Sequence, residues 1–164
     1  MPSSILYAEV MTYRIKGLEP QAFTHLFDLD DAELQSRGMT RMTVDNPNFP
    51  CRVSLRDCEL GDEVILLNHV SHDGDGPYRA SHAIFVSKSA SKAANYEDTI
   101  PPALARRILS LRAFDSAGMM IDAALAQPGE ADSVIRKLMD NPDTSHVDAH
   151  NAIRGCFAAR IDRT

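Results

Sequence analysis

Residues 50–57 of the chain read Pro-Cys-Arg-Val-Ser-Leu-Arg-Asp, and residues 61–67 read Gly-Asp-Glu-Val-Ile-Leu-Leu. In the first stretch, apolar residues alternate with polar ones from residue 51 to residue 56, which predicts a strand with one apolar face and one basic face. The continuous apolar run over residues 64–67 is typical of a central strand that is covered on both sides. The connection at Gly61-Asp62 is too short for a parallel crossover, so an antiparallel arrangement is expected.

The rest of the chain contains more strand patterns than helix patterns. Helices are predicted after Pro20, after the capping-box pattern Asp30-x-x-Glu33, and over residues 131–139, where apolar residues recur at helical spacing. Residues 87–103 predict a long connection. Further strands are predicted near residues 9–16, 83–86, 107–114, 119–126, 145–149 and 155–162. The sequence therefore predicts an α+β fold, with a mainly antiparallel sheet and a few helices packed on one face.

Length and charge narrow the class of protein. A chain of 164 residues is expected to form one globular domain over residues 1–164. A net charge of −6 disfavours nucleic acid and acidic membrane surfaces as partners. No apolar run approaches the roughly 20 residues that a membrane-spanning helix needs. The start of the chain does not resemble a signal peptide, and the cysteine count is odd, so a cytoplasmic protein with reduced thiols is expected.

Several motifs that identify known classes of enzyme or cofactor site are absent from the sequence. It contains no phosphate-binding loop, no dinucleotide fingerprint, no G-x-S-x-G elbow and no C-x-x-C pair. It therefore gives no reason to expect a bound cofactor. A small anionic metabolite and a homodimer are the partners that the sequence leaves open.

Arginines suggest where an anion would bind. Arg52 and Arg56 are expected on the polar face of one strand, and Arg160 on another strand of the same sheet. Guanidinium groups on one face form a fork for a carboxylate or phosphate. The alternative is that they pair with nearby acidic residues and only solvate the sheet. Other local basic groups that could hold a small anion are Arg106-Arg107, Arg112, Arg154 and Arg163.

Cysteines suggest a different chemistry. Cys51 and Cys156 each stand beside an arginine, which would lower a thiol pKa and favour a reactive thiolate. A histidine such as His69 or His82 would then serve as the base. The alternative is that these cysteines are small buried hydrophobic residues, and Cys51 shares its predicted face with apolar neighbours.

His146 and His150 are four residues apart with Asp148 between them. On a strand or a helix this spacing places both rings on one face, where they could reach one metal ion. A third ligand would come from another histidine, among them His69, His72 and His82, or from a cysteine. The alternative is that these are surface or loop histidines of an acidic segment.

The segments quoted above resemble a family of small bacterial proteins, domain of unknown function 1203. The resemblance spans most of the chain and implies no particular activity. Ser54 and Ser87 stand where the family pattern has a second cysteine and a histidine, which weakens a shared metal or redox role. The positions that the resemblance marks as important are Cys51, Arg52, Tyr78, Gly155, Cys156 and Arg160.

Two functions follow from these observations. The first is a binding or interaction domain that holds a small anionic ligand on an arginine-bearing sheet face, with Arg52, Arg56, Tyr78 and Arg160 as ligand-binding residues. The second is a small enzyme that uses Cys51 or Cys156 as nucleophile with a histidine base. We favour the first, because the second depends on a side-chain geometry that a sequence does not contain.

Overall fold

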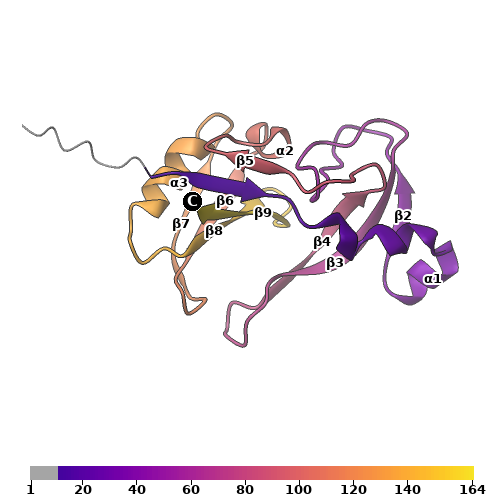
Figure 1. Cartoon of the computed structure of the whole chain (residues 1–164), viewed down its shortest axis with the longest axis horizontal. Helices are drawn as coiled ribbons and strands as arrows, with labels where there is room; N and C mark the ends of the chain where they lie inside the picture. Colours follow the sequence, from indigo (N-terminus) through magenta and orange to yellow (C-terminus); the bar gives the residue numbers. More distant parts are fainter. Residues whose placement is uncertain (1–10) are drawn as a thin grey trace, which may run out of the picture.

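The computed structural model describes residues 11–164 of the chain. These residues form two antiparallel sheets with short helices (Figure 1). The six-stranded sheet has the order β5 (Asn95–Glu97), β1 (Tyr13–Lys16), β9 (Phe157–Arg163), β8 (His146–Asn151), β6 (Leu109–Phe114) and β7 (Met120–Ala126). The three-stranded sheet has the order β2 (Thr40–Thr43), β3 (Glu63–His72) and β4 (Ala80–Ser87). The predicted α+β class with mainly antiparallel pairing is confirmed.

Helices are short and few in the described residues. They are α1 (Asp31–Ser36), α2 (Pro102–Ala105) and α3 (Ala131–Met139), with 3₁₀ turns at Pro20–Ala22 and Thr24–Asp28. The capping box predicted at Asp30 and Glu33 is present at the start of α1, with both reciprocal hydrogen bonds formed. None of the helices in residues 11–164 is long and apolar enough to cross a membrane.

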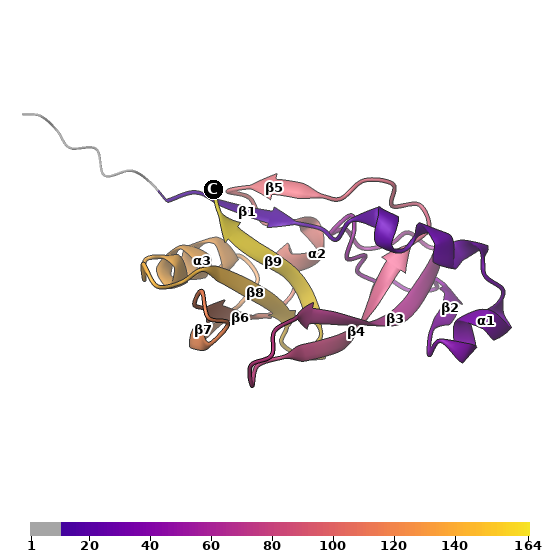
Figure 2. The same cartoon turned by 60° about the horizontal axis from the view of Figure 1, so that its bottom comes forward.

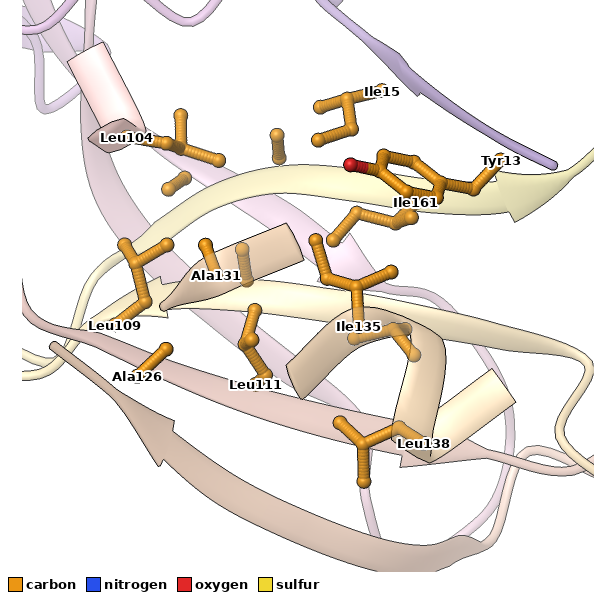
Figure 3. Packing of buried hydrophobic residues seen from close by; sticks show 14 of the residues in the cluster. Tyr13, Ile15, Leu104, Leu109, Leu111, Ala126, Ala131, Ile135, Leu138 and Ile161 are labelled. Carbon is orange, nitrogen blue, oxygen red and sulfur yellow. The ribbon is translucent and has the colours of Figure 1, made fainter. Parts of the chain in front are cut away.

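Helix α3 covers one face of the six-stranded sheet, as its apolar spacing predicts. Ile135 and Leu138 are buried from the helix side, and Leu111 and Ile161 are buried from β6 and β9 (Figure 3). Burying side chains of this size stabilises the fold by roughly 1.5–3 kcal/mol each. We call this cluster of buried residues, which includes Leu111, Ile135, Leu138 and Ile161, the α3 core. It holds the strands in place and so positions the residues on the opposite face of the sheet.

Strand β8 is buried on both faces, which is unusual for a strand that carries charged residues. Val147 and Ala149 point into the α3 core, and His146, Asp148 and His150 alternate with them toward the other face. The β3–β4 hairpin lies against that face, and Figure 2 shows it beside the start of β9. His72 and His82 of this hairpin contact His146 and His150, respectively.

A second core lies between the three-stranded sheet and the N-terminal helical turns. Leu34 of α1 and Phe23 pack against Ile65 of β3 and Ile84 of β4. Cys51 and Val53 of the preceding loop are part of the same cluster.

The prediction of a strand over residues 51–56 is wrong. The segment is a turn, closed by a bridge between Pro50 and Asp57 and by a hydrogen bond from the Leu55 N–H to the Cys51 carbonyl. Leu55 has a positive φ of 55°. The apolar residues alternate for another reason: Cys51 and Val53 enter the second core, whereas Leu55 enters the α3 core. The turn therefore joins the two cores instead of extending a sheet.

Two smaller differences concern short strands. β2 and β5 have no counterpart among the predicted strands, and β5 lies inside the expected long connection over residues 87–103. The first predicted strand, near residues 9–16, is shorter in the structure and begins at Tyr13, and its first two residues lie outside the described part.

Candidate functional site

A pocket of about 1080 Å³ opens where the turn of residues 50–57, strand β4 and the β8–β9 connection meet. This volume is slightly above the range of roughly 300–1,000 Å³ that is typical of sites for small organic molecules. Apolar side chains such as Leu66, Phe85, Ile108 and Pro128 supply part of the wall. The polar and charged lining consists of Asn48, Arg52, His82, Arg106, Arg107, Gln127, Asn151, Arg154 and Cys156.

Arg52 is the most enclosed charge of this pocket, with an exposed fraction of 2%. Its Nε donates to the Phe157 carbonyl and its Nη1 to the Pro50 carbonyl, both at 2.7 Å, and its Nη2 lies 3.2 Å from Cys156 Sγ. Burial lowers the pKa of the guanidinium, because a charge loses solvation there. Among the described residues, no carboxylate forms an ion pair with Arg52.

The other arginines of the pocket share one carboxylate. Arg106 Nε and Arg107 Nη2 contact the two oxygens of Asp57 at 3.0 and 2.6 Å. Arg154 is exposed and forms no ion pair within the described residues. Four arginines thus line the pocket beside a single acidic partner, in a chain whose net charge is −6. The pocket is locally cationic on an acidic protein.

Cys156 and His82 lie in the same pocket. The sulfur of Cys156 accepts hydrogen bonds from Arg52 and, at 3.5 Å, from Asn151 Nδ2. The pKa of His82 is lowered, first by burial and then by the charges of Arg112 and Arg52, so its ring is neutral near pH 7. Its Nδ1 is buried without a hydrogen-bond partner.

Cys51 and His69 are placed differently from this pair. Cys51 is 1% exposed and belongs to the second core, although a hydrogen bond from the Cys58 thiol lowers its pKa to about 5. Such burial keeps a thiolate away from any substrate. His69 packs against the ring of Phe157 and is not part of the pocket lining.

The expected stripe of arginines on one sheet face does not form. Arg52 is buried and Arg56 is exposed, because the segment that carries them is a turn. Arg160 lies on β9 but is exposed and pairs with Asp162 at 2.9 Å. Tyr78 is 38% exposed, with its edge against the ring of Phe114, and does not line the pocket.

His146 and His150 share a face of β8, as their spacing predicts, but they contact different neighbours. His150 faces His82, with ring centroids 4.8 Å apart, and its Nδ1 contacts the Gly155 carbonyl at 3.0 Å. His146 lies beside His72 and Asp148, and the potential ligand atoms of these three residues lie within 4.8 Å of one another. Within residues 11–164, the group whose geometry could hold a metal ion is therefore His72, His146 and Asp148.

Sequence reasoning assigned only one of the four pocket arginines to a site. Arg106, Arg107 and Arg154 were visible as local basic groups, but Arg106-Arg107 and Arg154 are far from Arg52 in the chain. Their convergence follows from the β6–β8–β9 pairing, which brings the start of β6 next to the β8–β9 connection. No local pattern in the sequence contains that information.

The fold and the pocket define a small α+β protein, built from two antiparallel sheets around a cationic cavity. The chain belongs to the family described as protein of unknown function (DUF1203), whose model matches residues 48–163. Neither the curated proteins nor the solved structures contain a match to it. The family match includes the whole turn of residues 50–57 and the β8–β9 connection, and thus both sides of the pocket.

Proposed function

We propose that this protein binds a small organic anion, with a carboxylate or phosphate group, in the arginine-lined pocket. The observation that carries the proposal is the buried guanidinium of Arg52, which faces the pocket without a carboxylate partner among the described residues. A buried charge is costly unless it is paired. An anion in the pocket would supply that missing charge.

The other pocket residues support the same chemistry. Arg52 uses its Nε and Nη1 on backbone carbonyls, so it contributes mainly charge. Arg154 has its guanidinium free of ion pairs in the described part and can offer two parallel N–H groups to a carboxylate or phosphate. Apolar walls such as Phe85 and Ile108 would hold a carbon skeleton. The proposed ligand is therefore an organic acid or a phosphorylated small molecule.

This proposal retains part of the expectation from sequence and moves its location. Arg52 keeps its role, whereas Arg106, Arg107 and Arg154 replace Arg56, Tyr78 and Arg160 as the proposed ligand-binding residues. A net charge of −6 still disfavours nucleic acid as the partner. A cytoplasmic location and a homodimer stay predictions.

Thermal denaturation tests the proposal with defined probes. The melting temperature is measured with inorganic phosphate, succinate, citrate and glucose 6-phosphate at constant ionic strength. A ligand at 100 times its Kd stabilises the folded state by about 2.7 kcal/mol, which is several degrees for a domain of this size. We expect at least one probe to stabilise the wild type, and the Arg106→Ala/Arg154→Ala double variant to lose most of that shift.

The matched control is the Arg56→Ala/Arg160→Ala double variant, which removes the same charge from two exposed arginines outside the pocket. The control should keep the wild-type shift. Equal loss in both double variants would mean that anions act through net charge alone, and the pocket would not be the site.

A second candidate is a thiol enzyme, and one observation favours it: Cys156 and His82 line the same pocket. Hydrogen bonds from Arg52 and Asn151 to the Cys156 sulfur would stabilise a thiolate. His82, neutral near pH 7, would accept the thiol proton.

Alkylation of the folded protein by iodoacetamide tests this candidate. The candidate predicts that Cys156 reacts faster than a model thiol near pH 7, that His82→Gln slows the reaction, and that Cys51 stays unmodified until the protein unfolds. Slow alkylation of Cys156, unaffected by His82→Gln, would exclude the thiol enzyme and leave the binding function intact.

A further inference from the structure

Three side chains from two sheets converge on one buried spot, away from the pocket. His72 comes from the end of β3, and His146 and Asp148 come from β8. His72 Nδ1 lies 3.8 Å from Asp148 Oδ2, and His146 Nε2 lies 3.6 Å from Asp148 Oδ1. These separations are too long for hydrogen bonds. They are close to the spacing of about 3.3–3.6 Å between ligands that surround a tetrahedral ion at ~2.0–2.2 Å.

Asp148 gives an independent reason to expect a bound cation. The residue is 1% exposed, and neither carboxylate oxygen has a hydrogen-bond partner in the structure. Arg112 and Arg160 flank it on the neighbouring strands, but Arg112 Nε donates to Ser110 and Arg160 pairs with Asp162. The buried carboxylate is therefore left without a compensating partner in the described residues, which is costly.

The tautomer of His72 gives a second reason. Its Nε2 lies 3.0 Å from the Gly118 carbonyl, and a carbonyl only accepts, so Nε2 carries the hydrogen. Nδ1 of the same ring faces the Asp148 carboxylate at 3.8 Å, without a hydrogen bond between them. With its hydrogen on Nε2, a neutral histidine ring has the lone pair of Nδ1 available for a metal ion. Metal-ligating histidines typically donate their other N–H to such a carbonyl.

Aromatic packing fixes the two rings. Phe114 stacks on His72 with ring centroids 4.2 Å apart and on His146 at 5.3 Å. The side chain of His72 keeps a 13% exposed fraction, while the other two ligands are almost fully enclosed. A shell of this kind keeps the ligands in place and leaves one side of the cluster close to solvent.

We propose that His72 Nδ1, His146 Nε2 and a carboxylate oxygen of Asp148 form a binding site for a divalent transition-metal ion of the zinc class. Two imidazole nitrogens and one carboxylate suit Zn²⁺ or Co²⁺ better than Mg²⁺ or Ca²⁺, which prefer oxygen ligands. Three protein ligands leave a fourth position for water or another small molecule. The site is independent of the anion pocket, because none of its ligands lines that pocket.

Titration of the untagged, EDTA-treated protein with Zn²⁺ and with Co²⁺ tests the site. Calorimetry should give one Zn²⁺ per chain, and Co²⁺ should give the visible absorption of a four-coordinate ion. His72→Gln, His146→Gln and Asp148→Asn should each weaken Zn²⁺ binding at least tenfold. His82→Gln and His150→Gln are the matched controls, since they remove the other contacting pair of histidines between β4 and β8, which lies outside the cluster. These controls should change the affinity less than threefold.

Asp148→Asn keeps the test decisive even if a histidine variant fails to fold. It preserves the shape of the side chain and removes an uncompensated charge, so the metal-free variant should be at least as stable as the wild type. It should nevertheless lose the zinc-dependent rise in melting temperature. Zinc binding at wild-type strength in Asp148→Asn, or equal losses in the His82→Gln and His150→Gln controls, would overturn the proposal. So would the absence of stoichiometric zinc binding to the wild type.

Discussion

Arg52 Nε donates a 2.7 Å hydrogen bond to the carbonyl of Phe157, although 105 residues separate them in the chain. Arg52 lies in the turn whose residues Cys51 and Val53 pack in the second core. Phe157 is the first residue of β9 in the six-stranded sheet. A single buried guanidinium therefore ties the three-stranded half of the molecule to the six-stranded half. The same group forms one wall of the proposed anion pocket.

Replacing Arg52 should destabilise the fold. Arg52→Ala leaves the buried carbonyl of Phe157 and the partly buried carbonyl of Pro50 without their Arg52 donors, and we expect a loss of about 3 kcal/mol in the free energy of unfolding. Arg56→Ala, which removes an exposed arginine of the same turn, should change it by less than about 0.5 kcal/mol. Urea denaturation measures both. Equal stability of the two variants would show that the Arg52 hydrogen bonds do not hold the halves together.

The two cores should unfold together, as expected of a single domain. Ile135→Ala in the α3 core and Ile84→Ala in the second core should each cost about 2–5 kcal/mol, because both side chains are almost fully buried. Each variant should show one unfolding transition, with far- and near-ultraviolet circular dichroism coinciding. Two separate transitions in either variant would contradict a single cooperative unit.

Gly118 should matter more than its place in a hairpin turn suggests. Its φ is +80°, and a Cβ there would lie 3.4 Å from His72 Nε2. Gly129 has a φ of +89° but no atom within 4 Å of the corresponding Cβ, so it is a matched control. Both alanine variants should lose about 1–2 kcal/mol of stability through backbone strain. Only Gly118→Ala should also weaken Zn²⁺ binding, because the strained turn shifts the Gly118 carbonyl that contacts His72 Nε2 at 3.0 Å; equal zinc affinities would show that this hydrogen bond is irrelevant.

The protein should lose stability as the pH falls below about 6.5, and His82 should contribute to that loss. Burial first, and then Arg112 and Arg52, lower the His82 pKa in the folded state, and His150 faces its ring. Below the unfolded value of about 6.5, the unfolded chain binds a proton that the folded chain does not. Above that pH the difference in proton binding therefore costs no stability, and the free energy of unfolding decreases as the pH falls below it.

His82→Gln should therefore show a smaller drop in unfolding free energy between pH 7.5 and pH 5 than the wild type. Part of the drop should persist, because burial lowers the pKa of His146 and of His150 to about 4. His25→Gln, at an exposed histidine, is the control and should follow the wild type. A steeper drop in His82→Gln would reverse the sign of this prediction.

Local patterns predicted the elements that depend on local physics. The spacing of residues 131–139 identified α3, the Asp30–Glu33 pair identified the start of α1, and the apolar run over residues 64–67 identified the first half of β3. Such patterns report which side of an element is buried. They do not report what buries it.

The turn of residues 50–57 shows that limit. Its alternation of apolar residues resembles a strand, but Val53 and Leu55 are buried in two different cores that neither residue specifies. The arginines predicted to share a site differ from those that line the pocket for the same reason, because Arg52 contacts Cys156, which is more than a hundred positions away. At β8 the spacing of His146 and His150 gave the correct face, and His72 of β3 decided which of them joins Asp148.

A titration followed by two-dimensional ¹H–¹⁵N NMR, with inorganic phosphate and with succinate at constant ionic strength, tests the central claim most directly. An anion in the pocket predicts saturable shifts that are largest at the backbone amides of Arg106, Arg107 and residues 151–156, with Arg56 and Arg160 nearly unmoved. Shifts that are largest at Arg56 or Arg160, or that spread over the surface without saturating, would contradict the claim that this pocket binds an anion.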